Sequence, residues 1–152
     1  MDAIDLVRQR LISEGVADEA HIIGCSDDEV KQVAAAQAAP MPRLYQRFLQ
    51  VMGRGAGDLL VGSDVYFPKV LGLRQSAAEL LAACGHPFDL PETAVVFLMH
   101  QGYQFMYFES AESEDPPVMR FMEGWRSPRQ EYPRFTDFLD GSIREVISVR
   151  ST

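Results

Sequence analysis

The sequence predicts an α+β fold, in which N-terminal helices and a C-terminal helix pack on a central, mainly antiparallel twisted sheet. Apolar residues recur at helical spacing in the first third of the chain and again near its end. Between them, residues 94–123 carry runs rich in β-branched and aromatic residues that are separated by turn formers. Helices first, an antiparallel sheet in the middle and a closing helix are the order of an α+β domain.

Length and composition are those of an ordinary globular chain. The 152 residues correspond to about one domain, so residues 1–152 are expected to form a single domain with a full core. Hydrophobic residues make up 47% and charged residues 24%, far from the disordered or fibrous classes. No stretch approaches the ~18 apolar residues of a membrane helix, and the N-terminus lacks a signal-peptide pattern. A cytoplasmic protein without membrane contact is therefore expected.

The charge balance narrows the class of partner. The chain has 22 acidic and 14 basic residues, a net charge of -8. Direct binding of nucleic acid is not expected, because phosphate recognition depends on a dense basic face. The charge favours a basic protein partner, although solubility alone would also account for it.

The two cysteines give no sign of a disulfide framework or a metal centre. Cys25 and Cys84 lie far apart and lack metal-like spacing, so both are expected to be small buried hydrophobes. No cofactor or metal is expected.

Four helices are predicted before the sheet, at about residues 4–14, 27–37, 42–52 and 76–83. Ser26 and Glu29 have the capping-box spacing that starts the second helix, and Pro42 suits the first turn of the third.

The glycines of residues 53–57 break the third helix. A nucleotide-binding loop would need a strand before the glycines and a helix after them, whereas here a helix precedes them. We therefore expect a tight connection to a strand at residues 58–61. A hairpin across residues 62–64 with a returning strand at 65–67 is expected to follow.

The sheet itself is predicted as a three-stranded meander. Gln101-Gly102 separates two apolar runs as a hairpin turn, and a break closed by Pro116-Pro117 precedes the third run, residues 118–123. Residues 123–133 are rich in turn formers and hold Trp125. Thr136 is predicted to cap the last helix.

The order of these elements and their residues resembles a known family. The resemblance rests on Ile22-Ile-Gly-Cys-Ser before a helix, Pro42-x-Leu-Tyr-x-x-Phe-Leu within the next, the glycine break, and the late Phe135-Thr-Asp-Phe-Leu. The strand to Gly102, the aromatic strand after it and the acidic loop complete the set. Together they resemble the Smi/Knr-like branch of the SUKH superfamily, which is related to fungal cell-wall assembly regulators, over about residues 22–139. Met52-Gly53-Arg54 replaces the frequent Asn-Gly-Gly, which retains the glycine and loses the polar Asn.

The resemblance implies an α+β fold and a non-catalytic role in binding proteins. In bacteria the superfamily consists chiefly of immunity proteins that bind and neutralise polymorphic toxins, many of them nucleases or deaminases. A cytoplasmic immunity protein with a basic toxin domain as its partner is therefore expected. The alternative is a regulatory module that scaffolds other cytoplasmic proteins.

Two surfaces are candidates for the partner. On the second strand Gln104 and Met106 point away from Tyr103, Phe105 and Tyr107, and each face either packs in the core or meets a partner. The acidic loop after this strand, joined by Glu123, can pair with the Arg and Lys of a toxin's nucleic-acid groove, or it is only a solvated turn. Lysine at Glu112 and Glu114 is expected to weaken binding. The predicted partner-binding residues are Gln104, Met106, Glu109, Glu112, Glu114, Asp115, Glu123 and Trp125.

An enzyme is not expected, and no catalytic residue is assigned. His21, His86 and His100 are isolated in the sequence, without a known catalytic motif. His100 is expected to cap backbone groups at a turn. A nucleophile-base pair of Cys25 with His100 remains open, and requires the two side chains to lie within hydrogen-bond reach.

Overall fold

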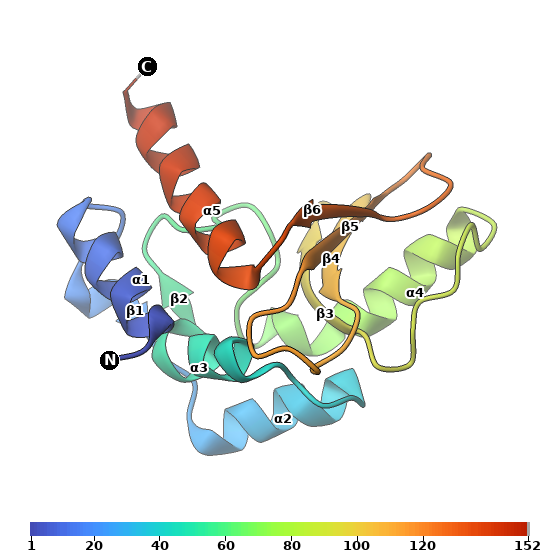
Figure 1. The fold of residues 1–152 in the computed structure, drawn as a ribbon, viewed down its shortest axis with the longest axis horizontal. Helices are drawn as coiled ribbons and strands as arrows, with labels where there is room; N and C mark the ends of the chain where they lie inside the picture. Colours follow the sequence, from blue (N-terminus) through green and yellow to red (C-terminus); the bar gives the residue numbers. More distant parts are fainter. Residues whose placement is uncertain (152) are drawn as a thin grey trace.

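An antiparallel sheet of four strands forms the centre of the computed structural model, which describes residues 1–151 (Figure 1). The strands follow one another as a meander in the order β3-β4-β5-β6. They are β3 (Val95–His100), β4 (Gln104–Phe108), β5 (Val118–Met122) and β6 (Arg129–Tyr132). The predicted α+β class and the three predicted strands are confirmed. The fourth strand was missed because Arg129-Gln-Glu-Tyr is polar and carries no apolar alternation.

Five α-helices surround this sheet, as predicted. They are α1 (Ala3–Ser13), α2 (Asp27–Gln37), α3 (Arg43–Met52), α4 (Leu73–Ala83) and α5 (Phe135–Arg150). Two 3₁₀ turns, η1 (Glu19–His21) and η2 (Lys69–Gly72), accompany them, and η2 runs directly into α4. The described part of the chain contains no helix long and apolar enough to cross a membrane.

The strands predicted at residues 58–61 and 65–67 are wrong. The chain turns repeatedly there, because Leu60 and Gly62 adopt positive φ angles of 58° and 97° that interrupt an extended conformation. The strand after α3 lies earlier, inside the glycine-rich segment: β2 (Gly55–Ala56) pairs with β1 (Ile22–Ile23) in a small second sheet. Only Asp64 joins the main sheet, through two backbone hydrogen bonds of 2.7 and 3.0 Å with Met99.

Aromatic side chains fill the space on both faces of the main sheet. On one face, Phe97 and Phe108 stack at 4.5 Å between ring centroids and meet Tyr45 of α3 and Phe135 of α5. On the other face, Phe121 packs against Phe105 of the sheet and Phe88 of the loop after α4. Helix α4 itself packs on β3.

A buried amide joins α2 to the edge of the sheet. Gln37, with no exposed surface, donates to the carbonyl oxygen of Val96 at 2.6 Å and accepts from its N–H at 2.9 Å. These two groups point outward from β3 next to the bulge at residue 97. Gln37 therefore pairs with the edge strand as another strand would, and it leaves no unpaired backbone group at this point.

The opposite edge of the sheet is protected by other means. β6 has four residues, a register irregularity against β5, exposed charges at Arg129 and Glu131, and prolines at 128 and 133 immediately beside it. Short length, charge and flanking proline all discourage the addition of a further strand.

The segment before α2 lies unusually close to the end of α3. A Cβ atom at Gly24 would lie 1.9 Å from the carbonyl oxygen of Gln50, and one at Gly53 would lie 2.5 Å from Sγ of Cys25. Gly53 has an ordinary φ of -66°. Close packing, and not the backbone conformation of a turn, is therefore the reason that a glycine is required at residue 53.

An ion pair closes the same junction. Glu29 completes the predicted capping box with Ser26, and its carboxylate also accepts from Nε of Arg54 at 3.0 Å. The Arg54 guanidinium lies over the ring of Phe67, 5.0 Å from its centroid. The hydrogen bond from Arg54 lowers the pKa of Glu29 to about 2.

Replacement of Gln37 by alanine is expected to destabilise the protein strongly. Two backbone groups of Val96 would be left buried without partners, at roughly 1–3 kcal/mol each. Urea unfolding followed by circular dichroism measures the change. Gln75→Ala, at an exposed position of α4, is the control, and equal stability of the two variants would contradict the role of Gln37.

The ion pair of Glu29 predicts a specific dependence on pH. Because folding lowers the pKa of Glu29 from 4.5 to about 2, its contribution is fully present above pH 4.5 and disappears as the pH falls toward 2. Glu29→Gln is expected to be less stable at pH 7 and to lose less stability between pH 4.5 and 2. Thermal unfolding of the parent and of Glu29→Gln between pH 2 and pH 7 measures this difference. Asp28→Asn, at an exposed position, is the matched control. An unchanged slope in Glu29→Gln would contradict the assignment.

Candidate functional site

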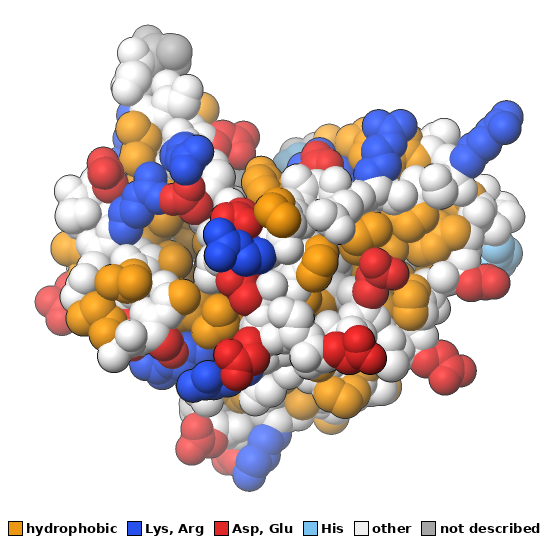
Figure 2. Space-filling model, viewed as in Figure 1, with side chains coloured by type: hydrophobic (Ala, Val, Ile, Leu, Met, Phe, Trp, Pro, Cys, Tyr) orange, Lys and Arg blue, Asp and Glu red, His pale blue; other side chains and the backbone are white. Residues whose placement is uncertain are grey.

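A cleft of about 610 Å³ separates the C-terminal half of α5 from the sheet. It opens as the hollow at the top of the molecule, between α5 and the strands (Figure 2). Three walls contribute. The sheet gives Leu98, His100, Gln104, Met106, Arg120 and Tyr132, the segment between β2 and η2 gives Asp58, Leu60, Val61 and Ser63, and α5 gives Phe138, Ser142, Glu145, Val146, Val149 and Arg150.

The sheet wall follows from the period of two along β4. Gln104 and Met106 point to the same face, and their cross-strand partners His100, Leu98 and Arg120 lie on that face with them. Phe108, further along this face, is covered by α3 and the start of α5. The face is therefore packed at one end of β4 and open to the cleft at the other.

Polar groups in the cleft are only partly satisfied. Nδ1 of His100 lies 2.9 Å from Oγ of Ser63, and Arg120 forms an ion pair with Glu131 at 3.1 Å. Oε1 of Gln104 and Nε of Arg120 are shielded from solvent and have no hydrogen-bond partner among residues 1–151. The His100 side chain thus contacts the segment between β2 and η2, in place of the backbone capping role expected for it.

Ion pairs and a hydrogen bond tie the outer wall to the N-terminal segment and to Asp58 of the neighbouring wall. Arg150 pairs with Asp58 and donates to the carbonyl oxygen of Gly15 at 2.5 Å. Arg10 of α1 pairs with Asp140 of α5. Glu145, which faces the cleft from α5, has no ion pair within the described residues.

Apolar side chains are exposed at the rim. Val61 is 74% exposed and Val149 is 70% exposed, and they belong to opposite walls. The two side chains give the hollow an apolar rim, and binding pockets are commonly lined by apolar side chains.

Of the residues predicted to bind a partner, Gln104 and Met106 lie in the cleft. Gln104 is half-buried and Met106 is buried with 6% exposed. The sequence did not indicate the walls from α5 and from residues 58–63. The apolar spacing of α5 was assigned to the core, and residues 58–61 were assigned to a strand.

The acidic loop after β4 is bound to two helix N-termini. Asp115 accepts hydrogen bonds from the backbone N–H of Thr136 at 2.9 Å and from its hydroxyl at 2.6 Å. The carbonyl oxygen of Glu114 accepts from the N–H of Leu44, and its carboxylate pairs with Arg43 at 3.2 Å. Thr136 is therefore not the predicted cap of α5; the capping carboxylate comes from Asp115, because the loop crosses the start of that helix.

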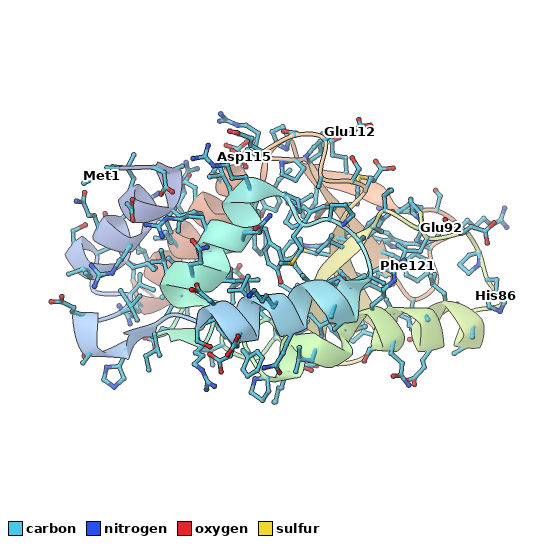
Figure 3. The ribbon with its side chains drawn as sticks, turned by 90° about the horizontal axis from the view of Figure 1, so that it is seen from below. Met1, His86, Glu92, Glu112, Asp115 and Phe121 are labelled. Atoms are coloured by element: carbon cyan, nitrogen blue, oxygen red, sulfur yellow. The ribbon has the colours of Figure 1, made fainter. Side chains whose placement is uncertain are left out.

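The remaining acidic candidates lie in two places. Glu109 and Glu112 are exposed on the acidic loop, and Figure 3 shows Glu112 at its outer bend and Asp115 near the start of α3. Glu123 does not join them. It lies at the far end of β5, where its N–H donates to the carbonyl oxygen of Tyr103.

Trp125 follows Glu123 in the hairpin between β5 and β6. It is half-buried against the core, and the guanidinium of Arg129 covers its ring at 4.0 Å. One face of the Trp125 ring is thus covered by Arg129 and is not open to a partner.

The structure separates the two side chains of the conceivable catalytic pair. Cys25 packs against Gly53 at the end of α3, whereas His100 contacts Ser63 and Tyr103 in the cleft. Burial raises the pKa of Cys25 to about 11, so its thiol is protonated at neutral pH and is a poor nucleophile.

The sheet, the surrounding helices, the net charge of -8 and the cleft beside the last helix define an acidic α+β protein with a candidate binding site. The model of the SMI1 / KNR4 family (SUKH-1) matches residues 24–141, and the chain belongs to this family. The predicted resemblance is thereby confirmed. A search of curated proteins gives no match.

Replacement of Asp115 by alanine is expected to destabilise the protein by roughly 0.5–2 kcal/mol, the usual cost of losing an N-terminal cap. Chemical unfolding gives the change in free energy. Glu112→Ala, on the same loop and exposed, is expected to stay within about 0.5 kcal/mol of the parent. A loss in Glu112→Ala as large as that in Asp115→Ala would contradict the capping role.

Proposed function

We propose that this protein is a non-catalytic, cytoplasmic protein-binding domain and that it acts as an immunity protein that neutralises a cognate toxin. The membership in the SMI1 / KNR4 family (SUKH-1) carries the proposal, because protein binding is the role associated with this family. Residues 1–152 act as a single domain in this proposal. The toxin is a basic domain of the nuclease or deaminase type.

The cleft supplies the contact site in this proposal. It combines apolar side chains with a small number of polar groups, as binding pockets do. Gln104 and Met106 then contact the partner from the sheet. The arrangement is also rigid on the sheet side, where the strands are held by the aromatic core, and rigidity lowers the entropic cost of binding.

The acidic surface supports the choice of a basic partner. The net charge is -8, and acidic side chains with fewer basic ones are scattered over the face that carries the acidic loop (Figure 2). Glu109 and Glu112, which make no ion pair within residues 1–151, remain free to attract a basic domain at long range. Their replacement by lysine would slow association and weaken its dependence on salt, whereas a change in the cleft would speed dissociation.

A regulatory scaffold remains the second proposal, since the same cleft would serve a cellular partner. The two functions differ in genetic context. An immunity protein is expected beside the gene of a large secreted toxin, and a scaffold is not.

Co-expression with the toxin domain encoded beside its gene tests the proposed function. The parent protein is expected to restore growth, and Val61→Asp in the cleft is expected to reduce protection and to raise the dissociation rate at least tenfold. Leu6→Asp is the matched control, because Leu6 is 55% exposed on α1, away from the cleft. Lack of protection by the parent would contradict the immunity function, and full protection by Val61→Asp would contradict the cleft as the contact site.

A further inference from the structure

Most of the outer wall of the cleft lies beyond the part of the chain that the family model matches, and only Phe138 of this wall lies inside it. That match ends at residue 141, whereas Ser142, Glu145, Val146, Val149 and Arg150 line the cleft from α5. The sheet wall lies entirely within residues 24–141. The cleft thus joins residues inside the family match with residues beyond it.

The same wall is attached to another segment outside the match. Arg150 contacts the carbonyl oxygen of Gly15, and Asp140 pairs with Arg10 of α1. Helices α1 and α5 also contact one another directly. The N-terminal helix therefore holds the outer wall in place, and the position of this wall does not depend on the sheet alone.

The charges around the cleft are almost all paired. Asp58 neutralises Arg150, and Glu131 neutralises Arg120. Glu145 alone among the charged residues lining the cleft has no ion pair within the described part of the chain. Its carboxylate therefore gives the rim one uncompensated negative charge, in a protein whose net charge is already -8.

Apolar side chains contribute to all three walls of the cleft. Val146 follows Glu145 on α5, and Val61 and Leu98 belong to the other two walls. A volume of about 610 Å³ lies within the roughly 300–1,000 Å³ of ordinary binding pockets, so a large side chain and part of its backbone can enter. A buried apolar anchor surrounded by weaker polar contacts is the usual composition of a protein–protein hot spot.

We propose that the cleft holds one large apolar side chain of the partner protein and that Glu145 binds a lysine or arginine next to it. The occupant is thus a segment of a basic protein. This inference rests on the proposed protein-binding function and specifies its site. It makes Glu145, outside the family match, a residue that selects the partner by charge, whereas Val61 and Val146 contribute affinity through apolar contact.

A displayed library of random twelve-residue peptides, sorted against the full-length protein, tests this inference without knowledge of the toxin. Selected peptides are expected to carry one aromatic or large aliphatic residue with a lysine or arginine within four positions. Their affinity is expected to fall at least tenfold with Glu145→Lys and with Val146→Asp. Glu79→Lys, the same charge change at an exposed position of α4, is the matched control and is expected to leave binding unchanged.

A second sort against Glu145→Lys gives the decisive comparison. Peptides with aspartate or glutamate in place of the basic residue are expected to be selected, since the charge at the rim is reversed. Circular dichroism establishes that the variant is folded. Failure to select any peptide, or peptides that do not respond to Glu145→Lys, would overturn the inference.

The outcome is distinguishable from failure of the immunity function. Peptides with the expected pattern, together with no protection against the neighbouring toxin, would support the site and contradict the immunity function. Protection that survives Glu145→Lys and Val146→Asp would support immunity and overturn this site.

Discussion

The arrangement of helices around the sheet depends on the amide of Gln37. An edge strand with buried, unpaired backbone groups is costly, and Val96 has both of its outward groups in the core. One side chain satisfies the two groups and thereby fixes where α2 meets β3. The close approach of Gly24 to the end of α3 then determines how α3 lies relative to the segment that leads into α2.

The connecting loops contribute to the structure more than their composition suggests. The acidic loop provides a carboxylate for the start of α5 and a carbonyl oxygen for the start of α3. One of its carboxylates, that of Asp115, thus complements an N–H group at the start of α5, and another, that of Glu114, pairs with Arg43 at the start of α3. In contrast, Glu109 and Glu112 keep their carboxylates in solvent.

Most of the architecture was predictable from the sequence, because local signals agree with the final fold. The helices follow apolar spacing, the capping box at Ser26 and Glu29 is formed, and Gln101-Gly102 turns the β3–β4 hairpin with positive φ at both residues. The errors lie where tertiary contacts dominate. β6 is polar and forms only because β5 offers it a partner. Residues 58–67 meet the sheet at Asp64 alone, which pairs with Met99, and do not follow their own strand propensity.

The candidate site was predictable only in part. Alternation along β4 identified Gln104 and Met106, since a period of two assigns faces without further information. The other walls come from segments distant in sequence, and no local pattern reveals that α5 diverges from the sheet. Likewise, Asp115 and Glu114 lie in the same acidic segment as Glu112. Only the positions of the two helix N-termini show that Asp115 and Glu114 have structural roles and that the Glu112 side chain has none within the described residues.

Closure of both sheet edges has an evolutionary consequence. Gln37 pairs with one edge strand, β3. The other edge strand, β6, is short, charged and flanked by prolines, so a partner meets side chains in place of free backbone groups. Recognition by side chains alone is changed by point substitution, without any shift of strand register. Single substitutions can therefore change which partner such a surface binds while the sheet stays intact.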